Sequence, residues 1–144
     1  MKRLIPLLGI LLTLLPLPQA IAQEVVVHQK VHQEEISRNT LRAIFGMRLL
    51  KWPDGRAIKV FVLQDDHTTH ITFSKSILHM FPYQLRRAWD RQVYSGTGQS
   101  PNEVSSLKEM SEKVASTPGA IGYLSHSIEH QFETKLDLKV LHVW

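Results

Sequence analysis

The sequence contains no cysteine among its 144 residues. Disulfide bonds, thiolate metal sites and thiol catalysis are therefore excluded, and an exported domain without disulfides has to take its stability from its core. The Gly-x-Ser-x-Gly motif of serine hydrolases is also absent. No catalytic set of residues is predicted and no cofactor is implied, so we expect a protein that binds and is not an enzyme.

The sequence also has little net charge. The formal net charge is +4, and removing Lys2 and Arg3, the only charged residues before Gln23, leaves +2 (4 − 2 = 2). The basic balance of the whole chain therefore depends strongly on its first residues. It does not predict binding to nucleic acid, and we expect no nucleic-acid partner.

A long apolar run follows these two basic residues, from Leu4 to Leu17, and is interrupted by prolines. The small-x-small pattern Ala20-Ile21-Ala22 comes next. This order is typical of a secretory signal peptide, whereas its length and prolines argue against a stable membrane anchor. We therefore expect residues 1–22 to be cleaved, leaving residues 23–144 as one periplasmic domain.

Two kinds of pattern alternate along residues 23–144. β-Branched or apolar segments predict strands over 24–31, 58–63, 120–124 and 136–143. Helices are predicted after Ser37 with a stop at Gly46, over 71–79, from Pro82, and after Ser106, which forms a capping box with Glu109. Alternating strands and helices indicate an α/β fold with some parallel pairing.

The stretch QDDHTTHITF, from Gln64 to Phe73, follows a predicted strand directly and allows three interpretations. Asp65, Asp66, His67 and His70 offer oxygen and nitrogen ligands for a metal, although His-x-x-His is a weak spacing by itself. An anion-holding loop is the second interpretation. The third, which the residue types favour, is an ordinary helix cap with a solvent-facing histidine.

Other polar and aromatic residues have simpler interpretations. His28, inside a predicted strand, is expected to be structural, and His126 and His130 are expected in a surface turn. Trp52 and Trp89 are expected in the core rather than as platforms for sugar stacking.

One helix and the loop after it carry further candidates. Arg86, Arg87 and Arg91 lack interleaved aromatic residues and are interpreted as a solvated surface. Ser95 to Pro101 is a flexible loop, whose segment Ser95-Gly96-Thr97-Gly98 resembles a phosphate cradle but lacks the lysine of a P-loop.

Three stretches in order carry a family resemblance: LRAIFGMRLLKWPDGRAI at 41–58, LRRAWDRQVYSGTGQSP at 85–101 and VASTPGAIGYLS at 114–125. They resemble the phosphate-binding proteins of bacterial ABC transporters, in the periplasmic substrate-binding superfamily, and most of all their short single-lobe relatives. The resemblance covers residues 24–143. It implies a single three-layer α/β lobe with a mixed, mostly parallel sheet flanked by helices, and a role in oxyanion binding for transport.

The resemblance also places the ligand. The family's phosphate loop corresponds to Gln64–Phe73, and the 95–98 loop faces the family's cleft, so the implied ligand contacts are Asp66, Thr68, Thr69, Ser95, Gly96 and Thr97. The family's arginine is replaced by Gln64, and its two loop glycines by His67 and Thr69. Guanidinium and close backbone N–H groups are what grip phosphate, so tight phosphate binding is not expected.

Chain length bears on partners. The 122 residues after the signal peptide leave no room for the opposing lobe of this family, and a lone lobe leaves a small ligand half exposed. We therefore expect a partner protein or a second copy to complete the cleft. The alternative is an interaction or sensory accessory module that kept the fold without the ligand.

Overall fold

The structure is a computed structural model and describes residues 22–126 and 137–144. The predicted signal peptide (apart from Ala22) and His130 lie outside these residues. The elements are β1 (Gln23–His28), β2 (Glu35–Ile36), α1 (Arg38–Phe45), β3 (Lys59–Leu63), α2 (Thr68–Ser76), α3 (Pro82–Tyr94), β4 (Asn102–Val104), α4 (Leu107–Ser116), β5 (Ala120–Ser125) and β6 (Leu138–Val143). None of the described helices is long and apolar enough to cross a membrane.

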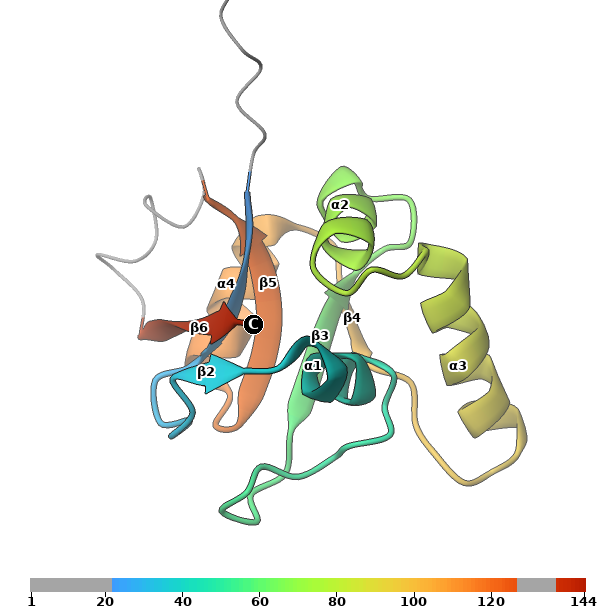
Figure 1. Ribbon diagram of the computed structural model, residues 1–144, viewed down its shortest axis with the longest axis horizontal. Coiled ribbons are helices and arrows are strands. Elements are labelled where there is room, and N and C mark those ends of the chain that lie inside the picture. The colour runs from blue at the N-terminus through green and yellow to red at the C-terminus, as the bar shows by residue number, and fades with distance from the viewer. Residues whose placement is uncertain (1–21, 127–136) are drawn as a thin grey trace, which may run out of the picture.

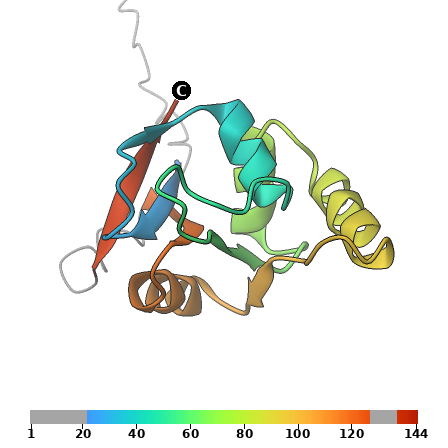
Figure 2. The same ribbon diagram turned by 90° about the horizontal axis from the view of Figure 1, so that it is seen from below.

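The strands form one sheet in the order β2-β6-β1-β5-β3-β4 (Figure 1). β1 pairs antiparallel with both β5 and β6, and the other three pairings, β2–β6, β3–β4 and β3–β5, are parallel. α4 covers one face of the sheet, while α1 and α2 lie on the other (Figure 2). The expected three-layer α/β lobe with a mixed, mostly parallel sheet is confirmed.

Local signals positioned most elements correctly. The Ser37 hydroxyl accepts the Thr40 N–H and begins α1, which ends at Gly46. Ser106 likewise accepts the Glu109 N–H to begin α4, but the Glu109 carboxylate bonds Ser105 rather than Ser106. The predicted capping box is therefore only half formed.

The structure departs from the sequence-based prediction in two respects. α2 begins at Thr68 and not at Ile71, because the His67 ring caps it one turn earlier. The strands β2 and β4 were not predicted, because two or three residues are too few to show a period-two pattern.

Trp52 and Trp89 lie in the core, as predicted, and each joins distant segments. The Trp89 indole N–H donates to the carbonyl of Phe45, at 2.7 Å, and so fixes α3 to the end of α1. The Trp52 indole N–H donates to the carbonyl of Gly119, at 3.0 Å, just before β5. Each indole therefore has its polar atom satisfied within an apolar environment.

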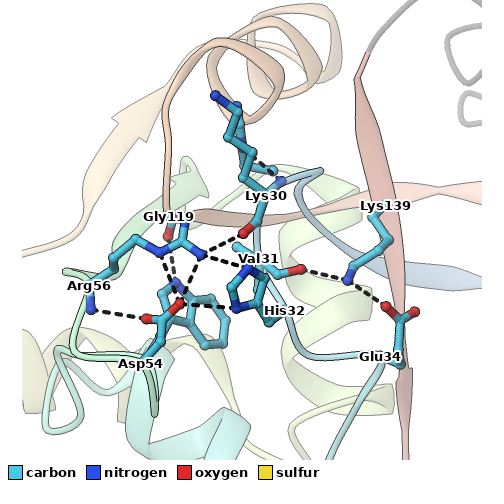
Figure 3. Close-up of polar contacts among 10 residues, drawn as sticks. Lys30, Val31, His32, Glu34, Asp54, Arg56, Gly119 and Lys139 are labelled. Carbon is cyan, nitrogen blue, oxygen red and sulfur yellow. Dashed lines mark hydrogen bonds and ion pairs between the residues drawn. The ribbon is translucent and has the colours of Figure 1, made fainter.

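A polar cluster connects the loop after β1 to the turn at residues 53–56 (Figure 3). The Arg56 guanidinium donates to Asp54, at 2.9 Å, and to the carbonyl of Lys30, at 2.7 Å. His32 lies 3.5 Å from the same Asp54 carboxylate. His28 is buried and accepts the Lys30 N–H, so its structural interpretation is confirmed.

Candidate functional site

The loop after β3 is closed by an internal ion pair. The Arg86 guanidinium donates two hydrogen bonds to Asp65, at 2.8 and 2.9 Å, and lies 3.7 Å from Glu103. Its hydrogen bonds to Asp65 raise the pKa of Arg86 further above its usual value. Arg86 also packs over the Trp89 ring, 4.9 Å from its centre. The prediction that Arg86 belongs to a merely solvated surface is therefore wrong.

The start of α2 is occupied by the chain's own side chain. Nδ1 of His67 accepts the backbone N–H of Thr69, at 3.1 Å, so the helix is capped as expected, but by the histidine itself. Asp66 and Thr68 are exposed, whereas Thr69 is buried. A helix N-terminus attracts anions through its free N–H groups, so this cap removes one of the donors that a phosphate would use.

His70 is fully buried, so the expectation of a solvent-facing histidine is wrong at this position. Its Nδ1 lies 2.5 Å from the Tyr123 hydroxyl, which in turn accepts the Leu63 N–H at 2.8 Å. The tautomer of the His70 ring sets which of these two atoms donates in the bond between Nδ1 and the Tyr123 hydroxyl. Burial lowers the pKa of His70 and keeps the ring neutral.

The metal interpretation gains no support from this arrangement. His67 and His70 each use Nδ1 in a hydrogen bond within the chain, one to the helix backbone and one to Tyr123. Within the residues that the structure describes, no three histidine or carboxylate side chains gather closely enough to hold a metal ion.

The second half of the predicted site lies elsewhere. Ser95, Gly96 and Thr97 follow the C-terminal end of α3, where the Ser95 and Thr97 hydroxyls bond each other at 2.7 Å. β4 runs parallel to β3, so the 95–101 loop enters at the N-terminal end of these strands, whereas Asp66 follows the C-terminal end of β3. Ser95, at the C-terminal end of α3, lies nine positions after Arg86, about 14 Å along the helix axis. The structure does not bring the two loops together.

A different concave surface lies between α1 and α3. We call it the basic groove, and its volume is about 920 Å³, within the range of ligand-binding pockets. Its lining residues are Arg42, Gly46, Arg48, His79, Met80, Gln84, Arg87, Ala88, Arg91, Gln92 and Thr97. Four arginines and one histidine thus line a hollow to which no carboxylate contributes.

Hydrogen bonds between helices build this groove. The Gln92 amide donates to the carbonyl of Gly46, at 2.6 Å, and holds α3 beside the end of α1. Nε of Arg42 donates to the carbonyl of Leu78, at 2.6 Å, just beyond the end of α2. Arg42 is therefore fixed in place and partly used by the fold, with its terminal nitrogens next to the groove.

The other three arginines of the groove are exposed. Arg87 lies over the Tyr83 ring, 5.4 Å from its centre. In the described parts of the chain, Arg48, Arg87 and Arg91 form no ion pair with a carboxylate. Arg87 and Arg91 are four residues apart and share one face of α3, which the sequence does indicate. Only packing places them opposite Arg42 and Arg48, so sequence reasoning missed the groove.

No protein-family model matches the sequence, and no curated protein matches it. Solved structures do. An ABC-type phosphate transport receptor from Vibrio cholerae superposes with a TM-score of 0.62 at 15% identity, over 84% of this chain and 45% of that one. PstS from Borrelia burgdorferi gives a TM-score of 0.66 at 16% identity, over 85% and 47%. The chain spans less than half the length of these proteins, and it has the fold of one lobe of a periplasmic binding protein.

Proposed function

We propose that this protein is an exported, non-catalytic binding domain that recognises an oxyanion-bearing ligand in the basic groove. The observation that carries the proposal is the imbalance of charge in that groove, where Arg42, Arg48, Arg87 and Arg91 meet no lining carboxylate. A guanidinium presents paired N–H donors that match phosphate, sulfate or carboxylate oxygens. Unpaired arginines from two sides of one hollow are therefore suited to an anion.

The basic groove lies at a different place from the family's phosphate loop, and we expect it to bind an anion with lower affinity. It is open to solvent, so each contact is screened, and modest affinity is expected for a single small anion. A partner that covers the groove would bury the ligand and strengthen each contact.

The similar structures support the class of ligand and the absence of chemistry. The Vibrio cholerae protein is a phosphate transport receptor, which is a binding function. In this chain, the Asp65–Arg86 pair and the His67 cap occupy the loop that the sequence resemblance matches to the family's phosphate loop. We therefore assign the anion to the basic groove, and assign the domain to the periplasm on the strength of its predicted signal peptide.

Calorimetric titration of residues 23–144 with inorganic phosphate and sulfate, at low ionic strength, tests the proposal. Replacing one unpaired arginine, in Arg48→Ala or Arg91→Ala, should weaken binding about tenfold, because a charge-assisted hydrogen bond contributes roughly 1.5–3 kcal/mol. Lys113→Ala removes an exposed positive charge on α4, across the sheet from the groove, and should leave the affinity unchanged. Equal losses of affinity in all three variants would indicate only nonspecific attraction and refute the assignment of the anion to the basic groove.

The second candidate function is an interaction or sensory module without a small ligand. The observation favouring it is the internally satisfied loop after β3, where the Arg86 guanidinium is bonded to Asp65 instead of to a ligand. A thermal-shift screen against phosphate, sulfate, molybdate, carboxylates and zinc separates the two functions. A shift at micromolar concentration of one oxyanion supports the first, and no shift across the panel supports the second.

A further inference from the structure

One exposed surface combines apolar side chains from α2 and α3. Ile71, Phe81 and Tyr83 are 36%, 51% and 56% exposed. They line one shallow hollow of about 530 Å³ together with Asp65, Asp66, Lys75, Pro82 and Arg86. Asp65 and Arg86 bond each other, so we define the α2–α3 face by the other two charged residues, Asp66 and Lys75, with Ile71, Phe81 and Tyr83. Exposed aromatic residues that cluster with a charged rim are typical of protein interfaces rather than of free surface.

The aromatic pair at this face is ordered. The Phe81 and Tyr83 rings stack with centroids 5.7 Å apart and an interplanar angle of 11°. Lys75 lies 6.0 Å above the Phe81 ring, and Arg87 lies over Tyr83. Two stacked rings supply a rigid contact that loses little conformational entropy when a partner docks.

The charges of the α2–α3 face have opposite signs at its two ends. Asp66 immediately precedes the first turn of α2, and Lys75 lies in its last turn. Asp66 lies two residues before Thr68, and the helix from Thr68 to Lys75 alone rises about 10 Å, so the two charges lie at opposite ends of α2. Ile71 is four residues before Lys75 and therefore shares its side of the helix. Neither charge forms an ion pair with another described residue.

We propose that a second copy of this chain docks on the α2–α3 face, with the two α2 helices antiparallel. A two-fold axis near Ile71 then brings Asp66 of each copy to Lys75 of the other, with the stacked rings of both copies beside the axis. An isologous interface has to be self-complementary, and a face with an acid at one end, a base at the other and apolar residues between meets that condition. A partner of one charge sign would instead leave one end repelled.

The α2–α3 face is a separate surface from the basic groove. The groove is lined by arginines of α1 and α3, whereas the α2–α3 face joins two copies through Asp66, Lys75 and apolar contacts. The two surfaces adjoin at Tyr83, over which Arg87 of the groove lies. Dimerisation is therefore testable without any ligand.

Sedimentation velocity of residues 23–144, from about 5 to 500 µM, measures the self-association. Asp66→Lys and Lys75→Asp each replace two attractive contacts by two repulsive ones, and each should weaken association about tenfold or more. When the two variants are mixed in equal amounts, the lysine introduced in one copy faces the aspartate introduced in the other, and the native Lys75 faces the native Asp66. The mixture should therefore associate as the wild type does. Thermal melts by circular dichroism confirm that each variant is folded.

The control variant is Lys113→Asp, which reverses an exposed lysine in the last turn of α4, a position equivalent to that of Lys75 in α2. Its association should equal that of the wild type. A wild-type protein that stays monomeric over the whole range overturns the inference. An equimolar mixture that associates no better than its separate components overturns the antiparallel arrangement, because any other docking would not pair these charges.

Discussion

Replacing Tyr123 by phenylalanine removes one buried hydroxyl that serves two partners. The Tyr123 hydroxyl accepts the Leu63 N–H, at the end of β3, and shares a second hydrogen bond with Nδ1 of His70 on α2. All three residues are fully buried. The ring itself stacks on Phe73, with centroids 3.9 Å apart, and phenylalanine preserves that contact. The substitution therefore isolates the two hydrogen bonds from the packing.

The expected loss follows from the groups left without a partner. A buried donor or acceptor that loses its hydrogen bond costs about 1–3 kcal/mol, so the Leu63 N–H and the His70 ring together cost about 2–6 kcal/mol. Phenylalanine no longer carries the desolvation penalty of the hydroxyl, which offsets part of this. We expect the free energy of unfolding to fall by about 2–4 kcal/mol, a large share of the roughly 5–15 kcal/mol typical of a domain.

Urea unfolding followed by tryptophan fluorescence measures this loss directly. Tyr83→Phe is the matched control, because Tyr83 is 56% exposed and makes no hydrogen bond through its hydroxyl within the described residues. The control should change stability by less than about 0.5 kcal/mol. If Tyr123→Phe proves as mild as the control, the hydroxyl does not join β3 to α2, and the reasoning about this network is refuted.

Two further predictions concern acid sensitivity and one glycine. Burial is the main cause that lowers the pKa of both His28 and His70 from 6.5. Below pH 6.5, these histidines therefore bind more protons in the unfolded chain than in the folded one. The free energy of unfolding consequently falls as the pH falls. His70→Asn should remove its share of that slope, at most about 1.4 kcal/mol per pH unit, in urea melts between pH 5 and 7. Gly119 has φ +78°, and an added Cβ would lie 2.3 Å from the Ala57 carbonyl oxygen. Gly119→Ala should therefore lower the free energy of unfolding by well over the roughly 1–2 kcal/mol that left-handed strain alone costs. Gly55→Ala, at φ +87° with open space around it, should cost only that strain, and equal losses in thermal melts would contradict the close contact.

Local sequence signals predicted the elements whose causes are local. Ser37 and Gly46 bound α1 because a side-chain hydroxyl and a chain-ending glycine act within one turn of the helix. The β-branched run of β1 predicted a buried strand, because such side chains favour the extended backbone locally. Strands of two or three residues, such as β2, carry no such signal, because partners far along the chain form them.

The features of the candidate site also differ in whether their causes are local in the sequence. The sequence by itself determined the alternation of strands and helices, the start of α1 at Ser37 and the absence of thiol chemistry, because each follows from residue type and short-range spacing. Only the tertiary structure decided that Arg86 neutralises Asp65, that His70 is buried against Tyr123, and that arginines from α1 and α3 line one groove. These pairs lie 21 to 53 residues apart or on separate helices, and the packing of α3 against α1 and α2 sets their distances, which no local pattern encodes.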